Sequence, residues 1–155
     1  MSIESVLEPG DHRDVAVALF NRTWELLDKE TRSVSENAEM LTAAFASRYH
    51  WRQVGEAKNF SVSDWQVSRV AAVLGYPDLA EAYGQQALEV AATAQLAPFY
   101  LGYAYEALAR AARLAGNRKA VAAHLAAAQE MLDMVDDPGE RDLLAPDLAE
   151  LASGS

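Results

Sequence analysis

Two short glycine-containing junctions constrain what this chain can fold into. They are Leu74-Gly75-Tyr76-Pro77-Asp78 and Leu114-Ala115-Gly116-Asn117-Arg118. In each, the glycine follows a run of apolar residues with helical spacing, and a new helix start follows within about three residues. The two glycines lie 41 residues apart, at positions 75 and 116. Consecutive helix–turn–helix hairpins at a fixed spacing are typical of a stacked helical repeat.

Helix-start signals recur along the rest of the chain. Ser33 and Glu36 form a capping-box pattern, in which the serine side chain accepts a backbone N–H and the glutamate reaches back. A connector is expected over residues 56–60. Val, Ile or Thr alternation bounded by hairpin turns, which would indicate a strand, does not occur in the sequence. The other expected helix starts are Ser61 with Asp64, Asp78 with Glu81, Pro98, Asn117 and Asp137.

These signals predict one all-α domain over residues 1–155, with about seven helices in stacked antiparallel hairpins. A length of 155 residues suits a single domain. The hairpins are expected at about 13–54, 60–95 and 98–135. A C-terminal capping helix is expected at about 138–152, kinked or restarted at Pro146. Twelve alanines between positions 101 and 130 favour close helix packing, although a plain helix bundle would use alanine equally well.

The segment 80–90, AEAYGQQALEV, resembles the second helix of a tetratricopeptide repeat. Such helices carry a small residue, here Ala80, and another seven residues later that leucine follows, here Ala87 and Leu88. The resemblance extends more loosely through the next hairpin and covers about residues 61–134. The chain departs from the family in its spacing, which is about 41 residues and not 34, and in Trp65, which lies one place off the usual tryptophan.

This resemblance implies a right-handed superhelix whose concave face binds peptides or partner proteins. The composition agrees with an ordered globule, because 51% of the residues are apolar and 23% are charged. A net charge of −10 argues against nucleic-acid partners. The sequence has no apolar run long enough to span a bilayer, so no membrane role is expected. It also shows no secretion signal and no cysteine, so the expected location is cytoplasmic.

Aromatic and charged residues gather in three places against an alanine-rich background. One group lies at the end of a long helix, one follows the connector, and one forms a stripe on the helix after Pro98. Aromatic walls with a few placed charges suit a ligand or a peptide. The alternative is that these residues only join the hairpins or form surface ion pairs. The candidate binding residues are Arg48, His50, Trp51, Trp65, Arg69, Tyr103, Glu106 and Arg110.

The sequence contains no pattern that is typical of a metal site or of a catalytic site. Its three histidines, His12, His50 and His124, include no pair spaced three or four apart, so no metal site and no cofactor is expected. It also contains no nucleophile elbow, phosphate loop, dinucleotide fingerprint or zinc-protease motif. We therefore expect no enzyme.

The expected function is a non-enzymatic binding module, a protein or peptide adaptor with a concave face lined by aromatic residues and arginines. The alternative is a small-molecule-binding protein, sequestering or sensing its ligand in an enclosed aromatic pocket. A homodimer is a third expectation, since short helical repeats often cover an exposed end by pairing.

Overall fold

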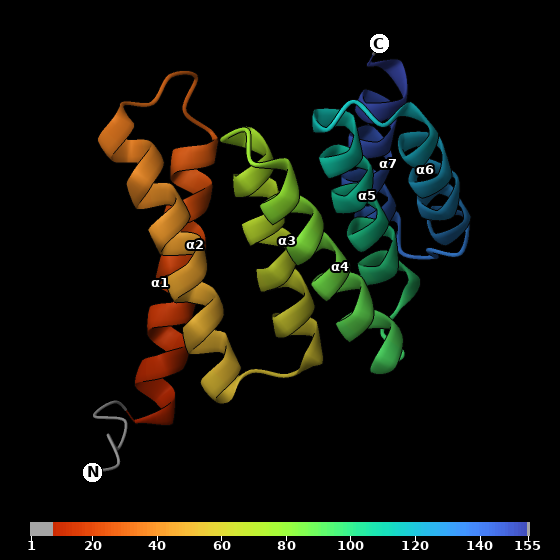
Figure 1. Ribbon diagram of the computed structural model, residues 1–155. Helices are drawn as coiled ribbons and strands as arrows, with labels where there is room; N and C mark the ends of the chain where they lie inside the picture. Colours follow the sequence, from red (N-terminus) through yellow and green to blue (C-terminus); the bar gives the residue numbers. More distant parts are fainter. Residues whose placement is uncertain (1–7, 155) are drawn as a thin grey trace.

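The computed structural model describes residues 8–154, and this part of the chain contains seven α-helices and no strand (Figure 1). The prediction of an all-α chain with about seven helices in hairpins is confirmed. The helices are α1 (Pro9–Leu27), α2 (Val34–Val54), α3 (Ala57–Val73), α4 (Pro77–Thr93), α5 (Pro98–Leu114), α6 (Arg118–Asp133) and α7 (Pro138–Ser153).

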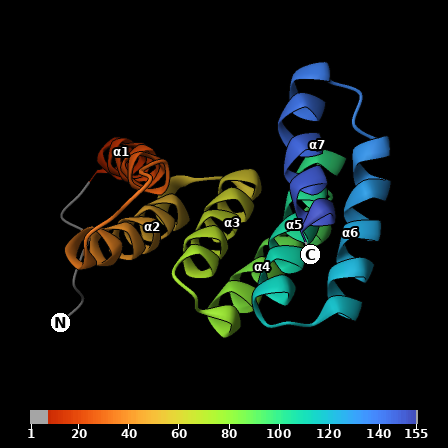
Figure 2. The ribbon, with the colours of Figure 1, turned by 90° about the horizontal axis from the view of Figure 1, so that it is seen from above.

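The helices form three successive hairpins, α1/α2, α3/α4 and α5/α6, and α7 packs against both α5 and α6. Figure 2 shows the hairpins following one another in a row, with α7 beside the last of them. Helix α3 is central because it contacts α2, α4 and α5. None of the described helices is both long and apolar enough to cross a membrane.

Both glycine junctions end their helices as the sequence predicts. Gly75 has a φ of 86° and Gly116 a φ of 75°, in the left-handed region where a side chain would be strained. The residue after each glycine donates its N–H back to the preceding helix. Tyr76 N lies 2.8 Å from Ala71 O, and Asn117 N lies 2.9 Å from Ala112 O. These bonds satisfy carbonyls that the helix end would otherwise leave unpaired.

Several predicted helix starts are confirmed and two are wrong. Ser33, Asn117 and Asp137 each cap a helix by accepting a backbone N–H. The expected bond from the Ser33 backbone N–H to the Glu36 carboxylate is absent, and that carboxylate pairs with Lys29 instead. The connector over 56–60 does not exist, because Glu56 and Asn59 already form a capping box and α3 begins at Ala57.

Ser61 therefore lies inside α3, where its hydroxyl donates to the carbonyl of Ala87 at 3.0 Å instead of capping a helix. Asp78 does not cap α4 either, since the cap position is Tyr76 and no side-chain bond forms there. Helix α7 runs through Pro146 as one helix, so the expected restart is absent from it.

Small residues let the helices around α5 approach closely. A Cβ built on Gly84 would lie 3.2 Å from a methyl carbon of Leu108, so α4 packs directly against α5 there. A Cβ on Gly102 would lie only 2.6 Å from a methyl carbon of Leu144 on α7. Leu144 is fully buried in a cluster with Ala128 and Leu132. This contact sets the position of α7 over α5, and therefore one wall of the cleft described next.

Candidate functional site

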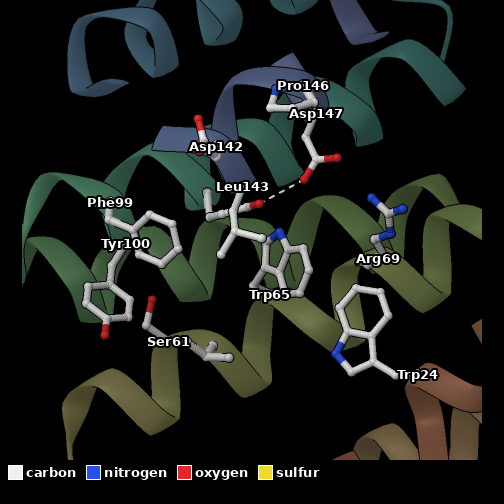
Figure 3. Close-up of a pocket in the computed structure, with 12 residues that line it drawn as sticks. Trp24, Ser61, Trp65, Arg69, Phe99, Tyr100, Asp142, Leu143, Pro146 and Asp147 are labelled. Carbon is white, nitrogen blue, oxygen red and sulfur yellow. Dashed lines mark hydrogen bonds between the residues drawn. The ribbon is translucent and has the colours of Figure 1, made fainter. Parts of the chain in front are cut away.

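A cleft of about 460 Å³ lies between the first helix of each hairpin and α7 (Figure 3). Helix α1 contributes one lining residue, and α3, α5 and α7 contribute the others. Most of them are aromatic or aliphatic, so the surface of the cleft is largely apolar. The lining residues are Trp24, Ser61, Val62, Trp65, Arg69, Phe99, Tyr100, Tyr103, Asp142, Leu143, Pro146 and Asp147.

Four of these rings contact one another in a chain, and we call them the aromatic floor: Trp24, Trp65, Phe99 and Tyr103. The ring centroids of Trp24 and Trp65 are 5.7 Å apart, and those of Trp65 and Tyr103 are 5.2 Å apart. Tyr103 meets Phe99 edge to face at 5.1 Å. Aromatic pairs favour such tilted and edge-to-face contacts. The floor therefore joins α1, α3 and α5 through a continuous aromatic surface.

A buried carboxylate fixes the floor from below. Glu106 on α5 is fully buried, and its Oε2 accepts a hydrogen bond from Trp65 Nε1 at 2.9 Å. Its Oε1 accepts from Arg110 Nε, also at 2.9 Å, and from the same guanidinium's Nη2. A buried carboxylate is tolerated only when charged and polar partners surround it in this way. These bonds hold the Trp65 indole in one orientation.

Arg69 lies at one end of the cleft beside Trp24 (Figure 3). Its guanidinium carbon is 6.0 Å from the centroid of the Trp24 ring, and its Nη1 is 3.9 Å from Glu106 Oε1. At this distance the two groups form an ion pair but not a hydrogen bond. Arg69 Nε is buried and has no hydrogen-bond partner among residues 8–154.

Tyr103 connects the floor to α7. Its hydroxyl donates to Asp147 Oδ2 at 2.9 Å, the contact drawn as a dashed line in Figure 3. Burial raises the pKa of the Tyr103 phenol, and the bond to Asp147 raises it further. The phenol therefore keeps its proton at neutral pH and serves as a donor to the α7 wall.

The structure does not bring all eight candidate residues to one pocket. Trp65, Arg69 and Tyr103 line the cleft. Glu106 and Arg110 lie behind it and support Trp65. The remaining three candidates, Arg48, His50 and Trp51, are not among its lining residues.

Arg48 belongs instead to a separate ion-pair group between α2 and α3. It pairs with Asp64 Oδ1, and Arg52 Nη2 lies 2.8 Å from Asp64 Oδ2. Asp64 is fully buried; burial raises the pKa of its carboxyl, and the two guanidinium groups oppose that shift. Arg48 also lies 5.1 Å from the ring centroid of Tyr83. This group links the first hairpin to the second.

Trp51 and His50 lie on the first hairpin. Trp51 is mostly buried under the guanidinium of Arg13, and it lines a smaller hollow of about 270 Å³. Val62 and Tyr100 border both this hollow and the cleft, so the two are adjacent. His50 contacts His12 on α1, with the two Nδ1 atoms 2.8 Å apart.

The sequence reasoning missed Trp24 and the whole contribution of α7. Trp24 stands four residues after Phe20 on one helix face, but no local pattern places that face opposite α3. Leu143 and Asp147 line the cleft because the terminal helix folds back over α5, which depends on the close contact at Gly102. Only the tertiary arrangement shows these residues as part of the site.

The described residues contain no group of three or more His, Asp or Glu side chains that could hold a metal ion. Comparison with protein-family models, with curated proteins and with solved structures finds no match for this chain.

Proposed function

We propose that this protein is a non-enzymatic binding module of the tetratricopeptide-like type, which docks a segment of a partner protein in the cleft. The observation that carries the proposal is the aromatic floor, whose four residues are partly exposed between the first helices of the hairpins and α7. Covering such an apolar surface with a ligand removes it from water and stabilises the complex.

Preorganisation supports the same proposal. The Trp65 indole is held by Glu106 and the Tyr103 hydroxyl by Asp147 before any ligand arrives. Ordering flexible side chains on binding costs conformational entropy and weakens association. Because these side chains are already held in place, binding incurs little of this cost. The adjacent hollow at Trp51 extends the surface along α3, which suits an extended or helical segment better than a single compact group.

Two of the polar side chains near the cleft, Glu106 and Ser61, have partners that leave little capacity for acid–base or nucleophilic chemistry. Glu106 is buried and accepts from Trp65 and Arg110. The Ser61 hydroxyl donates to a backbone carbonyl of α4, and within the described chain no histidine contacts it. A nucleophile needs an adjacent base within hydrogen-bond reach. This arrangement favours binding over catalysis.

The test is selection of a displayed random-peptide library on the full-length protein. Leu143 borders the cleft and is 61% exposed, so Leu143→Gln removes apolar contact area without altering the charge or the core. Met134 lies after α6 and outside the cleft, and it is 58% exposed, so Met134→Gln is a matched control. We expect selected peptides to bind the Leu143→Gln variant about tenfold more weakly, while Met134→Gln binds as the wild type does.

A second readout locates the binding. The indole N–H signals of Trp24 and Trp65, which line the cleft, should move in NMR spectra on addition of peptide, and that of Trp51 should move only for a segment that reaches the adjacent hollow. Peptides that bind both variants equally and leave the two indole signals in place would contradict the proposal.

A small-molecule-binding function is the second candidate, and one observation favours it. Helix α7 covers one side of the cleft, and about 460 Å³ is within the range of small-ligand sites. Native mass spectrometry of the purified protein tests this candidate. A co-purifying mass that is lost in Leu143→Gln but retained in Met134→Gln would support it, and a bare protein mass in all three would count against it.

A further inference from the structure

We propose that the segment bound in the cleft is basic and amphipathic: an apolar or aromatic side chain rests on the aromatic floor, and a neighbouring Lys or Arg pairs with Asp142 and Asp147 on α7. This inference rests on the proposed binding function and adds the chemistry of the partner. It comes from comparing which charged groups around the cleft already have partners and which do not.

Of the arginines near the cleft, Arg110 and Arg141 already donate hydrogen bonds, whereas Arg69 makes none within residues 8–154. Arg110 bonds to Glu106, and Arg69 lies against Trp24 with its Nη1 3.9 Å from the same carboxylate. Arg141 directly precedes Asp142, which lines the cleft. Its Nη1 donates to the carbonyls of Leu132 at 2.6 Å and Val135 at 3.1 Å, at the end of α6. A cation that satisfies C-terminal carbonyls is stabilised there. An anionic ligand would have to compete with these acceptors for Arg110 and Arg141, and the charge of Arg69 is partly offset by Glu106.

The carboxylates on the α7 side of the cleft, Asp142 and Asp147, are freer to bind a ligand, and we call them the rim carboxylates. Asp142 is exposed, and no side chain in the described part of the chain pairs with it. Asp147 uses only Oδ2, in its bond from Tyr103, so Oδ1 is left to accept from a ligand. Figure 3 shows both residues on α7, on the opposite side of the cleft from Ser61 on α3. A ligand on the floor would therefore have two carboxylates beside it.

The geometry suits a long basic side chain. Leu143 follows Asp142 directly and is exposed, so the methylene stem of Lys or Arg can cover it while the charged head reaches a carboxylate. The rings of Phe99 and Tyr103 add an electronegative face to which a cation is attracted. At longer range, the net charge of −10 raises the local concentration of basic ligands.

The test uses the peptides selected on the wild type and two double variants that each remove two negative charges. Asp142→Asn/Asp147→Asn removes the rim charges, and the asparagine can still accept from Tyr103. Glu130→Gln/Asp136→Asn removes the same charge from exposed positions on and just after α6, and it serves as the control. A synthetic copy of the best peptide is compared with its Lys→Met and Lys→Glu derivatives.

We expect the selected peptides to carry Lys or Arg beside an apolar residue. The rim variant removes two ion pairs that each contribute modestly, so it should bind the peptides about tenfold more weakly than the wild type. The control removes neither pair, so its affinity should differ from that of the wild type by less than about twofold. The Lys→Met peptide should bind the wild type more weakly and respond little to the rim variant. Added salt should weaken the basic peptide most.

Two outcomes would overturn the inference, and they can be told apart. If the peptides that depend on Leu143 are acidic or uncharged, and the rim variant binds them as the wild type does, the basic partner is wrong while the binding function stands. If no peptide depends on Leu143, both proposals fail.

Discussion

Gln95, between α4 and α5, takes the left-handed backbone conformation that Gly75 and Gly116 take at the junctions α3/α4 and α5/α6. Its φ is 53°, and it alone among the described non-glycine residues has a positive φ. Its N–H and that of Leu96 donate to Ala92 O at 3.2 Å and Ala91 O at 2.9 Å, as at Gly75 and Gly116. A side chain in this region costs about 1 kcal/mol. Gln95 is exposed, so little packing depends on it.

Gln95→Gly should therefore stabilise the fold. We expect the free energy of unfolding to rise by about 0.5 kcal/mol, since relief of strain exceeds the added freedom of glycine in the unfolded chain. The reverse change, Gly116→Gln, should destabilise by about 1 kcal/mol, because a Cβ there meets no atom within 4 Å and only the strain is added. Urea denaturation measures both. Loss of stability in Gln95→Gly would show that strain at this turn is not the dominant cost.

Glu106 shows how far the sequence predicts the surroundings of a side chain. The spacing of Glu106 and Arg110 on one helix predicts that they pair, and that pair does form. Its bond to Trp65 joins residues 41 positions apart, the interval between Gly75 and Gly116. Equivalent positions on α3 and α5 are neighbours because the hairpins repeat at this spacing. The repeat could be predicted from the sequence, whereas the burial of the carboxylate could not.

The contact between α1 and α2 includes a pair of histidines. His12 is almost fully buried, and its Nδ1 lies 2.8 Å from that of His50. One ring must carry a proton on Nδ1 and the other must not, so protonation of both removes the acceptor and places two cations together. Burial lowers the pKa of His50 below its usual value, and the charge of His12 lowers it further.

Acidification should therefore weaken the fold. Between the lowered pKa of His50 and about 6.5, the unfolded chain binds more protons than the folded one. The contribution of His50 to the free energy of unfolding is therefore fully present above about pH 6.5 and is lost as the pH falls below that value. The slope for one such group is at most about 1.4 kcal/mol per pH unit. His50→Gln should flatten the dependence measured by urea denaturation from pH 7.5 to 5.5. His124→Gln, which keeps the pair, is the control; equal slopes in the two variants would contradict this account.

On the scale of the whole chain, the repeated hairpins were predictable and the completed site was not. Glycine spacing, capping residues and apolar periodicity are local, so they indicate the helices between residues 61 and 134, although the start of α3 and the cap of α4 differ from the prediction. The position of α7 depends on contacts between Gly102 and Leu144, which lie far apart in sequence. The same holds for Trp24, which meets Trp65 only when α1 packs beside α3. The cleft is assembled from these distant contacts.

Helix α7 should act as the cap of the stack as well as a wall of the cleft. It buries Leu144, Leu148 and Leu151 against the last hairpin, and each fully buried leucine contributes about 2 kcal/mol. A chain that ends after residue 136 should lose on the order of 5 kcal/mol of unfolding free energy. It should also expose the apolar face around Leu132, which packs against Leu144 and Leu148 of α7.

Terminal repeats need a polar outer face to remain soluble, so the shortened chain should also self-associate. Urea denaturation and size-exclusion chromatography with light scattering measure the two effects. A chain ending after residue 153 keeps all of α7 and serves as the control. If the shorter chain stayed monomeric with an unchanged unfolding midpoint, α7 would be dispensable for the fold, and its one remaining role would be to supply Asp142, Leu143 and Asp147 to the cleft.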